Sequence, residues 1–207
     1  DQAKGPVTNP IEMGMKDHAA VVSRIAAIPA YKAEFQKVFG RSGVTIDNFA
    51  KAVAAYERTL ITPDSAYDRY VKGDDKALTA QQKRGLDTVL ATGCTACHSG
   101  TAFAGPALPP GQGFYQKFPL IPGSSYEKKY DLTSDPGREK VTKNAADHGM
   151  FRVPTWRNVA LTAPYFHNGS VPTLDEAVRV MAKTQLGKDL TDAQAADIVA
   201  FLGSLTG

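Results

Sequence analysis

One short motif constrains this chain more than any other feature. In the run "GCTACHSG", Cys94 and Cys97 are two residues apart, His98 follows at once, and the chain has no other cysteine. Cys-x-x-Cys-His is the attachment site of c-type haem, in which both thiols form thioethers and the imidazole binds iron. A redox dithiol, a disulfide and half of a zinc site are the alternatives, but a dithiol does not need the histidine, and no second cysteine pair exists for zinc. The motif predicts one covalent haem c.

Composition excludes several classes of protein. The 207 residues are 43% hydrophobic and 22% charged with a net charge of +3, a balance that suits a globular chain with a real core and does not favour nucleic acid as a partner. No apolar run approaches the roughly 20 residues needed to cross a bilayer. The chain begins "DQAKGP" without Met, so we expect a processed or truncated product. Because bacteria attach haem covalently outside the cytoplasmic membrane, we expect a periplasmic location.

Hydrophobic periodicity and capping signals predict a helical chain with long loops. Thr79 with Gln82 and Thr191 with Gln194 form capping boxes, and Thr173 with Glu176 begins another helix. The expected helices cover 17–28, 31–40, 45–60, 65–73, a segment from 79 to the haem motif, 174–185 and 192–205. Residues 99–149 are rich in Gly and Pro but too apolar for simple disorder, so we expect them to wrap a ligand. The predicted fold is all-α, a c-type cytochrome domain with long haem-wrapping loops.

The second axial ligand of the iron decides between an electron carrier and an enzyme that handles oxidants. Met181 shares a predicted helical face with Leu174, Ala177 and Val178, a pattern equally typical of a core methionine. His167 lies in a loop among aromatic residues and suits a ligand, a partner of a haem propionate or a structural role. Spacing alone leaves the choice open. The full set of candidates is Met13, Met15, Met150, Met181, His18, His148 and His167.

Three further stretches carry a resemblance to a known family. Together with "GCTACHSG", the runs "GMFRVPTWRNVALTAPYFHNGSVPTLDEAVRVM" and "LTDAQAADIVAFLGSL" resemble the C-terminal haem domain of bacterial dihaem cytochrome c peroxidases. The run "DQAKGPVTNPIEMGM" resembles the segment that follows the first haem domain of that family. The resemblance covers nearly the whole chain and is poorest at about 103–145. It implies an interdomain part, 1–75, and a domain for the high-potential electron-transfer haem, 76–207.

The resemblance also implies roles for single residues. The family's "AV-x-x-M" helix maps onto Ala177–Met181, which makes Met181 the second ligand of the haem at Cys94, Cys97 and His98. A related branch that oxidises protein tryptophans carries Tyr in place of this Met. Backbone carbonyls of Thr162 and Pro164 align with part of a calcium site.

Three residues near the N-terminus align with the family's peroxide-handling loop. Gln2 is implied to orient peroxide, Pro6 to shape the loop, and Glu12 to transfer a proton between the two peroxide oxygens as a general acid-base. From the residues alone, Glu12 reads as a solvated turn residue and Gln2 as part of a frayed terminus. The resemblance is therefore the whole basis for these catalytic roles.

The chain departs from the family in having one haem motif instead of two. The resemblance implies that the peroxidatic haem domain is missing, and that the 207 residues alone are inactive. The intact protein is then expected to reduce hydrogen peroxide with electrons from a small cytochrome c or copper protein. A stand-alone monohaem electron carrier and a protein-oxidising relative are the alternative functions. The assembly state, including a homodimer, stays open.

Overall fold

The structure is a computed structural model that describes residues 1–109 and 111–207. It divides into two compact units, 1–61 and 62–207. The expected functional boundary after residue 75 stays a prediction. None of the described helices combines the length and the apolar character needed to cross a membrane.

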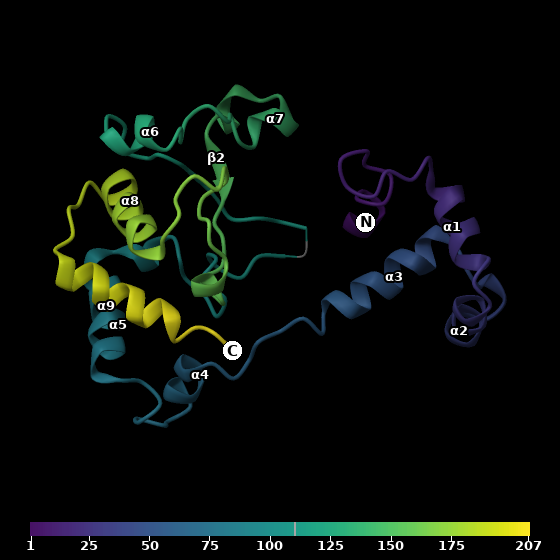
Figure 1. The fold of residues 1–207 in the computed structure, drawn as a ribbon, viewed down its shortest axis with the longest axis horizontal. Helices are drawn as coiled ribbons and strands as arrows, with labels where there is room; N and C mark the ends of the chain where they lie inside the picture. The colour runs from purple at the N-terminus through teal and green to yellow at the C-terminus, as the bar shows by residue number, and fades with distance from the viewer. Residues whose placement is uncertain (110) are drawn as a thin grey trace. The chain divides into compact units, whose positions relative to one another are not determined.

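The first unit is helical. It contains η1 (Gln2–Lys4), α1 (His18–Ala26), α2 (Pro29–Phe39), η2 (Gly40–Ser42) and α3 (Ile46–Glu57), as Figure 1 shows. The Asp17 side chain accepts a hydrogen bond from the backbone of Ala20 and caps α1, and Thr45 caps α3 in the same way. Pro29 stands at the first turn of α2, so this helix begins two residues before the expected start at 31. The fixed φ of proline is suited to the first position of a helix.

The second unit holds the haem motif. Its elements are α4 (Ala66–Val71), α5 (Ala80–Thr92), η3 (Cys94–Ala96), β1 (Tyr115–Lys117), α6 (Ser125–Lys129), α7 (Glu139–Thr142), η4 (Ala145–Asp147), β2 (Met150–Arg152), η5 (Val159–Leu161), α8 (Leu174–Leu186) and α9 (Asp192–Gly203). The capping boxes expected at the starts of α5 and α9 are both confirmed. Thr173 caps α8, but the side chain of Glu176 does not return the bond. Its carboxylate instead accepts hydrogen bonds from Lys129 and Tyr130.

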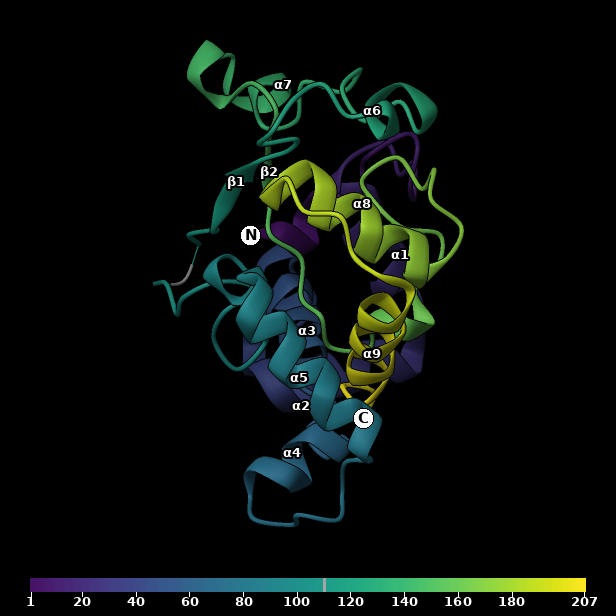
Figure 2. The same ribbon diagram turned by 90° about the vertical axis from the view of Figure 1, so that its left-hand side faces the viewer.

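The core of the second unit lies where α5 and α9 pack against each other, as both ribbon views show (Figures 1 and 2). Gly85 allows the close approach, because a Cβ there would lie 2.0 Å from the backbone oxygen of Asp197. Phe201 and Val89 are fully buried in this core, and Phe103 joins them from the loop after the haem motif. The start of that loop is therefore fixed to the same core as the helix that precedes the motif.

The long Gly- and Pro-rich region contains more structure than its sequence indicates. The strands β1 and β2 pair antiparallel, with Gln116 opposite Phe151, and α6 and α7 are helices of five and four residues. Elements this short have no room for a periodic pattern, so the sequence could not predict them. Pro110, in the same region, lies outside the described residues. The predicted class is confirmed: the chain is mostly helical, and residues 1–109 and 111–207 contain two short strands.

Candidate haem-binding site

A cavity of about 510 Å³ lies in the second unit and is bordered by the haem motif. Its walls come from α5, β2, α8, α9 and the segment 153–167. Of the described residues in 99–149, the region expected to wrap a ligand, only Gln116 and Phe118 border this cavity. Apolar side chains dominate these walls, among them Val89, Leu174, Val178, Ile198 and Leu202. Such a lining suits a large, flat, mostly apolar ligand.

The two cysteines stand at the C-terminal end of α5. Gly93 ends the helix with φ of 93°, a left-handed conformation that favours glycine, and the chain then turns through η3. Cys94 and Cys97 are free thiols, and both border the cavity. Burial and the neighbouring Cys94 raise the pKa of the Cys97 thiol, whereas the thiols of redox dithiols have lowered pKa values. The turn thus presents both thiols to one cavity.

His98 is buried and has a single tautomer suited to binding metal. Its Nδ1 lies 3.0 Å from the backbone oxygen of Phe103, and because a carbonyl only accepts, Nδ1 carries the hydrogen. The other nitrogen, Nε2, is then the free electron-pair donor. Burial lowers the pKa of His98, although the carbonyls of Phe103 and Pro154 oppose the shift, so the imidazole is neutral at neutral pH. A neutral imidazole is the form that binds iron.

Met181 borders the same cavity from α8. The predicted face of this helix is confirmed, since Leu174, Ala177, Val178 and Met181 all line the cavity. Met181 also packs against the buried cluster around Val180 and Val171. The position therefore satisfies both interpretations left open by the sequence, a core methionine and a haem ligand.

The structure separates the other candidates for the second ligand. Among the described residues, His167 is the only other candidate that borders this cavity, and its ring stacks on Phe151 with centroids 4.3 Å apart. Met150 lines a different cavity, of about 810 Å³, beside the two-stranded sheet. His148 is exposed and pairs with Glu139 at 2.7 Å. The remaining candidates, Met13, Met15 and His18, belong to the first unit.

The three candidate catalytic residues lie in the first unit. Gln2 and Glu12 are exposed, and Pro6 is half-buried. Backbone hydrogen bonds fold the segment into a compact loop, including one of 3.2 Å from the Met13 amide to the Pro6 carbonyl and one of 3.1 Å from the Glu12 amide to the Asn9 carbonyl. These bonds give the loop a folded backbone, and the loop presents Glu12 to solvent.

Thr162 and Pro164 lie on the turn between η5 and α8, and both border the haem-motif cavity. In the part of the chain that the structure describes, no three His, Cys, Asp or Glu side chains are placed to hold a metal ion. A calcium site built on the two backbone carbonyls stays a prediction.

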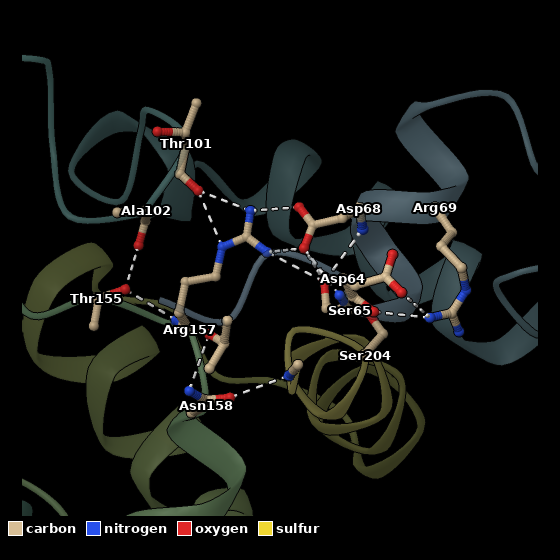
Figure 3. A network of polar contacts seen from close by, with 12 residues as sticks. Asp64, Ser65, Asp68, Arg69, Thr101, Ala102, Thr155, Arg157, Asn158 and Ser204 are labelled. Carbon is tan, nitrogen blue, oxygen red and sulfur yellow. Dashed lines mark hydrogen bonds and ion pairs between the residues drawn. The ribbon is translucent and has the colours of Figure 1, made fainter. Parts of the chain in front are cut away.

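The sequence analysis missed the residues that surround His98. Trp156 stacks on the imidazole with ring centroids 4.4 Å apart and planes 21° apart. Next to it, the Arg157 guanidinium forms a two-point ion pair with Asp68, at 2.7 and 2.8 Å, and donates to the Thr101 carbonyl (Figure 3). The available signal was a lone tryptophan and an arginine in the proline-punctuated run "VPTWRN". Neither has a spacing that points to the haem motif, so only the fold reveals them.

The fold and the site define a class of protein: a helical c-type cytochrome domain in which the Cys-x-x-Cys-His motif borders an apolar cavity. Residues 1–76 match the di-haem cytochrome c peroxidase family, and residues 153–185 match the RoxA-like, cytochrome c-like family. The chain is 46% identical to a cytochrome c551 peroxidase of Pseudomonas aeruginosa, 43% to the cytochrome c peroxidase Ccp of Escherichia coli and 40% to a cytochrome c551 peroxidase of Nitrosomonas europaea.

The alignments cover all of this chain but only 58%, 42% and 58% of those three proteins, respectively. A crystal structure of a MauG-like protein associated with microbial copper homeostasis superposes with a TM-score of 0.78 at 27% identity, covering 99% of this chain and 67% of that one. The chain belongs to the dihaem cytochrome c peroxidase family, a family of haem-containing oxidoreductases, and spans part of the length of its relatives.

Proposed function

We propose that this chain carries the high-potential, electron-accepting haem of a periplasmic peroxidase that reduces hydrogen peroxide to water. Cys94 and Cys97 would hold the haem covalently, and His98 and Met181 would be its two protein ligands. The observation that supports this most is that all four side chains border one apolar cavity. A haem bound in this way supplies reversible one-electron exchange, and a methionine ligand raises its potential.

The residues around the cavity have different proposed roles. His98 offers Nε2 because Nδ1 is committed to the Phe103 carbonyl. Met181 would be the second protein ligand of the iron and would keep peroxide away from this site. The apolar walls exclude water, which favours the less charged, reduced form of the bound group. Because His98 and Met181 would fill both ligand positions of this iron, peroxide reduction needs a second haem with a free position.

The family resemblance supports the wider chemistry of the intact protein. Gln2, Pro6 and Glu12 serve the peroxide site, with Glu12 taking a proton from one peroxide oxygen and returning it to the other. Two electrons and two further protons convert one hydrogen peroxide into two waters. A small cytochrome c or copper protein donates the electrons, and the carbonyls of Thr162 and Pro164 contribute to a calcium site.

A stand-alone monohaem electron carrier is the second candidate function, because one haem motif is enough to exchange single electrons. The N-terminal segment distinguishes the two functions, because a carrier has no use for a peroxide loop. A protein-oxidising relative is a third candidate, marked by a ligand other than Met. The intact mass of the protein purified from its source reports chain length and haem number together, and a carrier predicts one haem where a peroxidase predicts two.

Replacement of Met181 tests the ligand assignment directly. In the haem-loaded protein, Met181→Ala should abolish the sulfur-to-iron charge-transfer band of the ferric form and allow the reduced form to bind carbon monoxide. Met150→Ala is the matched control, because Met150 lines the other cavity. A band that survives Met181→Ala, or one that is lost in Met150→Ala, overturns the assignment.

A further inference from the structure

We infer that Trp156 is a positioning residue for the haem site, whose ring fixes the plane of the His98 imidazole; the inference rests on the proposed function, in that His98 is an axial ligand. The two rings lie nearly parallel, 4.4 Å between centroids. A hydrogen bond from Nδ1 fixes one edge of an imidazole but leaves the ring free to tilt about that bond. A flat ring against its face removes this freedom.

Phe103 connects both constraints. Its carbonyl accepts the hydrogen bond from His98, and its ring stacks on Trp156 with centroids 5.4 Å and planes 19° apart. Phe201 contacts the edge of Trp156 from α9, at 6.5 Å and 84°. Trp156 is therefore held between His98 and Phe103 on one hand and Phe201 of the buried core on the other. A movement of its ring would displace His98 or Phe103.

The backbone on both sides of Trp156 is fastened to the loop that follows the haem motif. The Thr155 hydroxyl donates to the Ala102 carbonyl, and the Arg157 guanidinium donates to the Thr101 carbonyl from two nitrogens, at 3.1 and 2.9 Å (Figure 3). The same guanidinium binds Asp68 at the start of α4. These bonds fix the position of Trp156 relative to residues 101–103.

The position of the ring has two measurable consequences. The orientation of an axial imidazole determines the anisotropy of the ferric haem, so loss of the Trp156 ring should shift and broaden the electron paramagnetic resonance signal. The ring also keeps water from His98. Loss of the ring would let water reach His98. Because water stabilises the more positively charged, oxidised form of the haem, replacing Trp156 should lower the midpoint potential.

The test uses the haem-loaded, full-length protein with Trp156→Ala, Trp156→Leu and Trp156→Phe. The Met-to-iron band reports only on the haem at His98, and a redox titration followed at this band gives the potential. We expect Ala and Leu to lower the potential and broaden the resonance signal, and Phe, which keeps a flat ring, to stay near wild type. The Leu variant keeps the inference testable if Ala does not fold.

Tyr67→Ala is the matched control. Tyr67 belongs to the same cluster but packs its ring on Phe103 and Phe201, at 5.3 and 5.8 Å. The inference is overturned if Tyr67→Ala shifts the signal as much as Trp156→Leu does, or if Leu and Phe behave alike. A wild-type protein without the Met band contradicts the proposed function instead. In that case the resonance comparison still tests Trp156, because His98 belongs to the haem motif itself.

Discussion

Gly85 on α5 lies close against the backbone of Asp197 on α9, where the two helices that form the core of the second unit pack together. A Cβ at Gly85 would lie 2.0 Å from the backbone oxygen of Asp197 and 2.7 Å from the Cβ of Phe201. Beside this crossing, the Arg84 guanidinium binds the Asp197 carboxylate through two contacts of 3.0 Å. Because α5 leads directly into the haem motif, the packing of α5 against α9 also fixes the position of Cys94.

Gly85→Ala should therefore destabilise the protein. Alanine is about 1 kcal/mol better than glycine inside a helix, but here its methyl group forces the helices apart, and overpacking typically costs about 1–3 kcal/mol or more. Denaturant unfolding of the haem-loaded protein measures the net loss. Gly203→Ala is the control, because a Cβ at Gly203 meets no atom within 4 Å. Equal stability of the two variants would contradict a tight crossing.

The ion pair between Asp68 and Arg157 predicts a pH dependence of stability. The hydrogen bonds from Arg157 lower the pKa of Asp68 from 3.8 to about 2. A carboxyl group with a lowered folded-state pKa stabilises the protein fully above its unfolded pKa. That contribution is lost as the pH falls through the folded value, here between about pH 4 and pH 2. With partial solvent screening, we expect about 1–2 kcal/mol.

Asp68→Asn should lower the free energy of unfolding at pH 7, and the difference from wild type should shrink as the pH approaches 2. Unfolding curves recorded at several pH values measure it. Asp197→Asn is the comparison, since its partner Arg84 is 60% exposed, and its effect should be smaller. A difference that stays constant from pH 7 to pH 2 would show that Asp68 acts through packing and not through its charge.

Local signals were enough to predict most helices of this chain. The capping residues Thr79, Thr173 and Thr191 each begin a helix as expected, because a cap is a contact between residues three positions apart. The apolar face that carries Met181 is likewise a property of one helix. Both kinds of pattern are complete within a short window of sequence.

Contacts between distant segments were not predictable in this way. Trp156 meets His98 across 58 positions of sequence, and Arg157 meets Asp68 across 89. Nothing in the spacing of these residues marks them as partners, since their meeting depends on how the loops fold over α5. The sequence therefore identified the groups proposed to touch the haem, while the residues that support them became visible only in the fold.

The 207-residue chain on its own should exchange electrons reversibly but show almost no peroxidase activity. If His98 and Met181 both bind the iron as proposed, the haem has no open position for peroxide. Stopped-flow mixing of the reduced chain with hydrogen peroxide measures the reaction. Met181→Ala is the positive control, because it opens a position and should speed the reaction. Rapid turnover by the wild-type chain while the Met band persists would place peroxide chemistry elsewhere.

Glu12 should matter for peroxide turnover only in the intact, two-haem protein. Glu12→Gln keeps the size of the side chain but removes the carboxylate proposed to move a proton between the peroxide oxygens. General acid-base catalysis contributes about 10²–10⁴-fold, so we expect a loss of kcat in that range. Steady-state peroxide reduction by the full-length variant measures this loss, with donor oxidation followed separately.

The spectrum and potential of the haem at His98 should barely change in Glu12→Gln, because the proposed role of Glu12 is at the other haem. Electron entry from the donor should survive for the same reason. Glu57→Gln, a matched change at an exposed glutamate at the end of α3, should leave turnover at the wild-type level. If Glu12→Gln also stays within about twofold of wild type, well short of the loss expected for a general acid-base, Glu12 is a solvated turn residue. The preference for a peroxidase over a simple electron carrier would then lose its main chemical support.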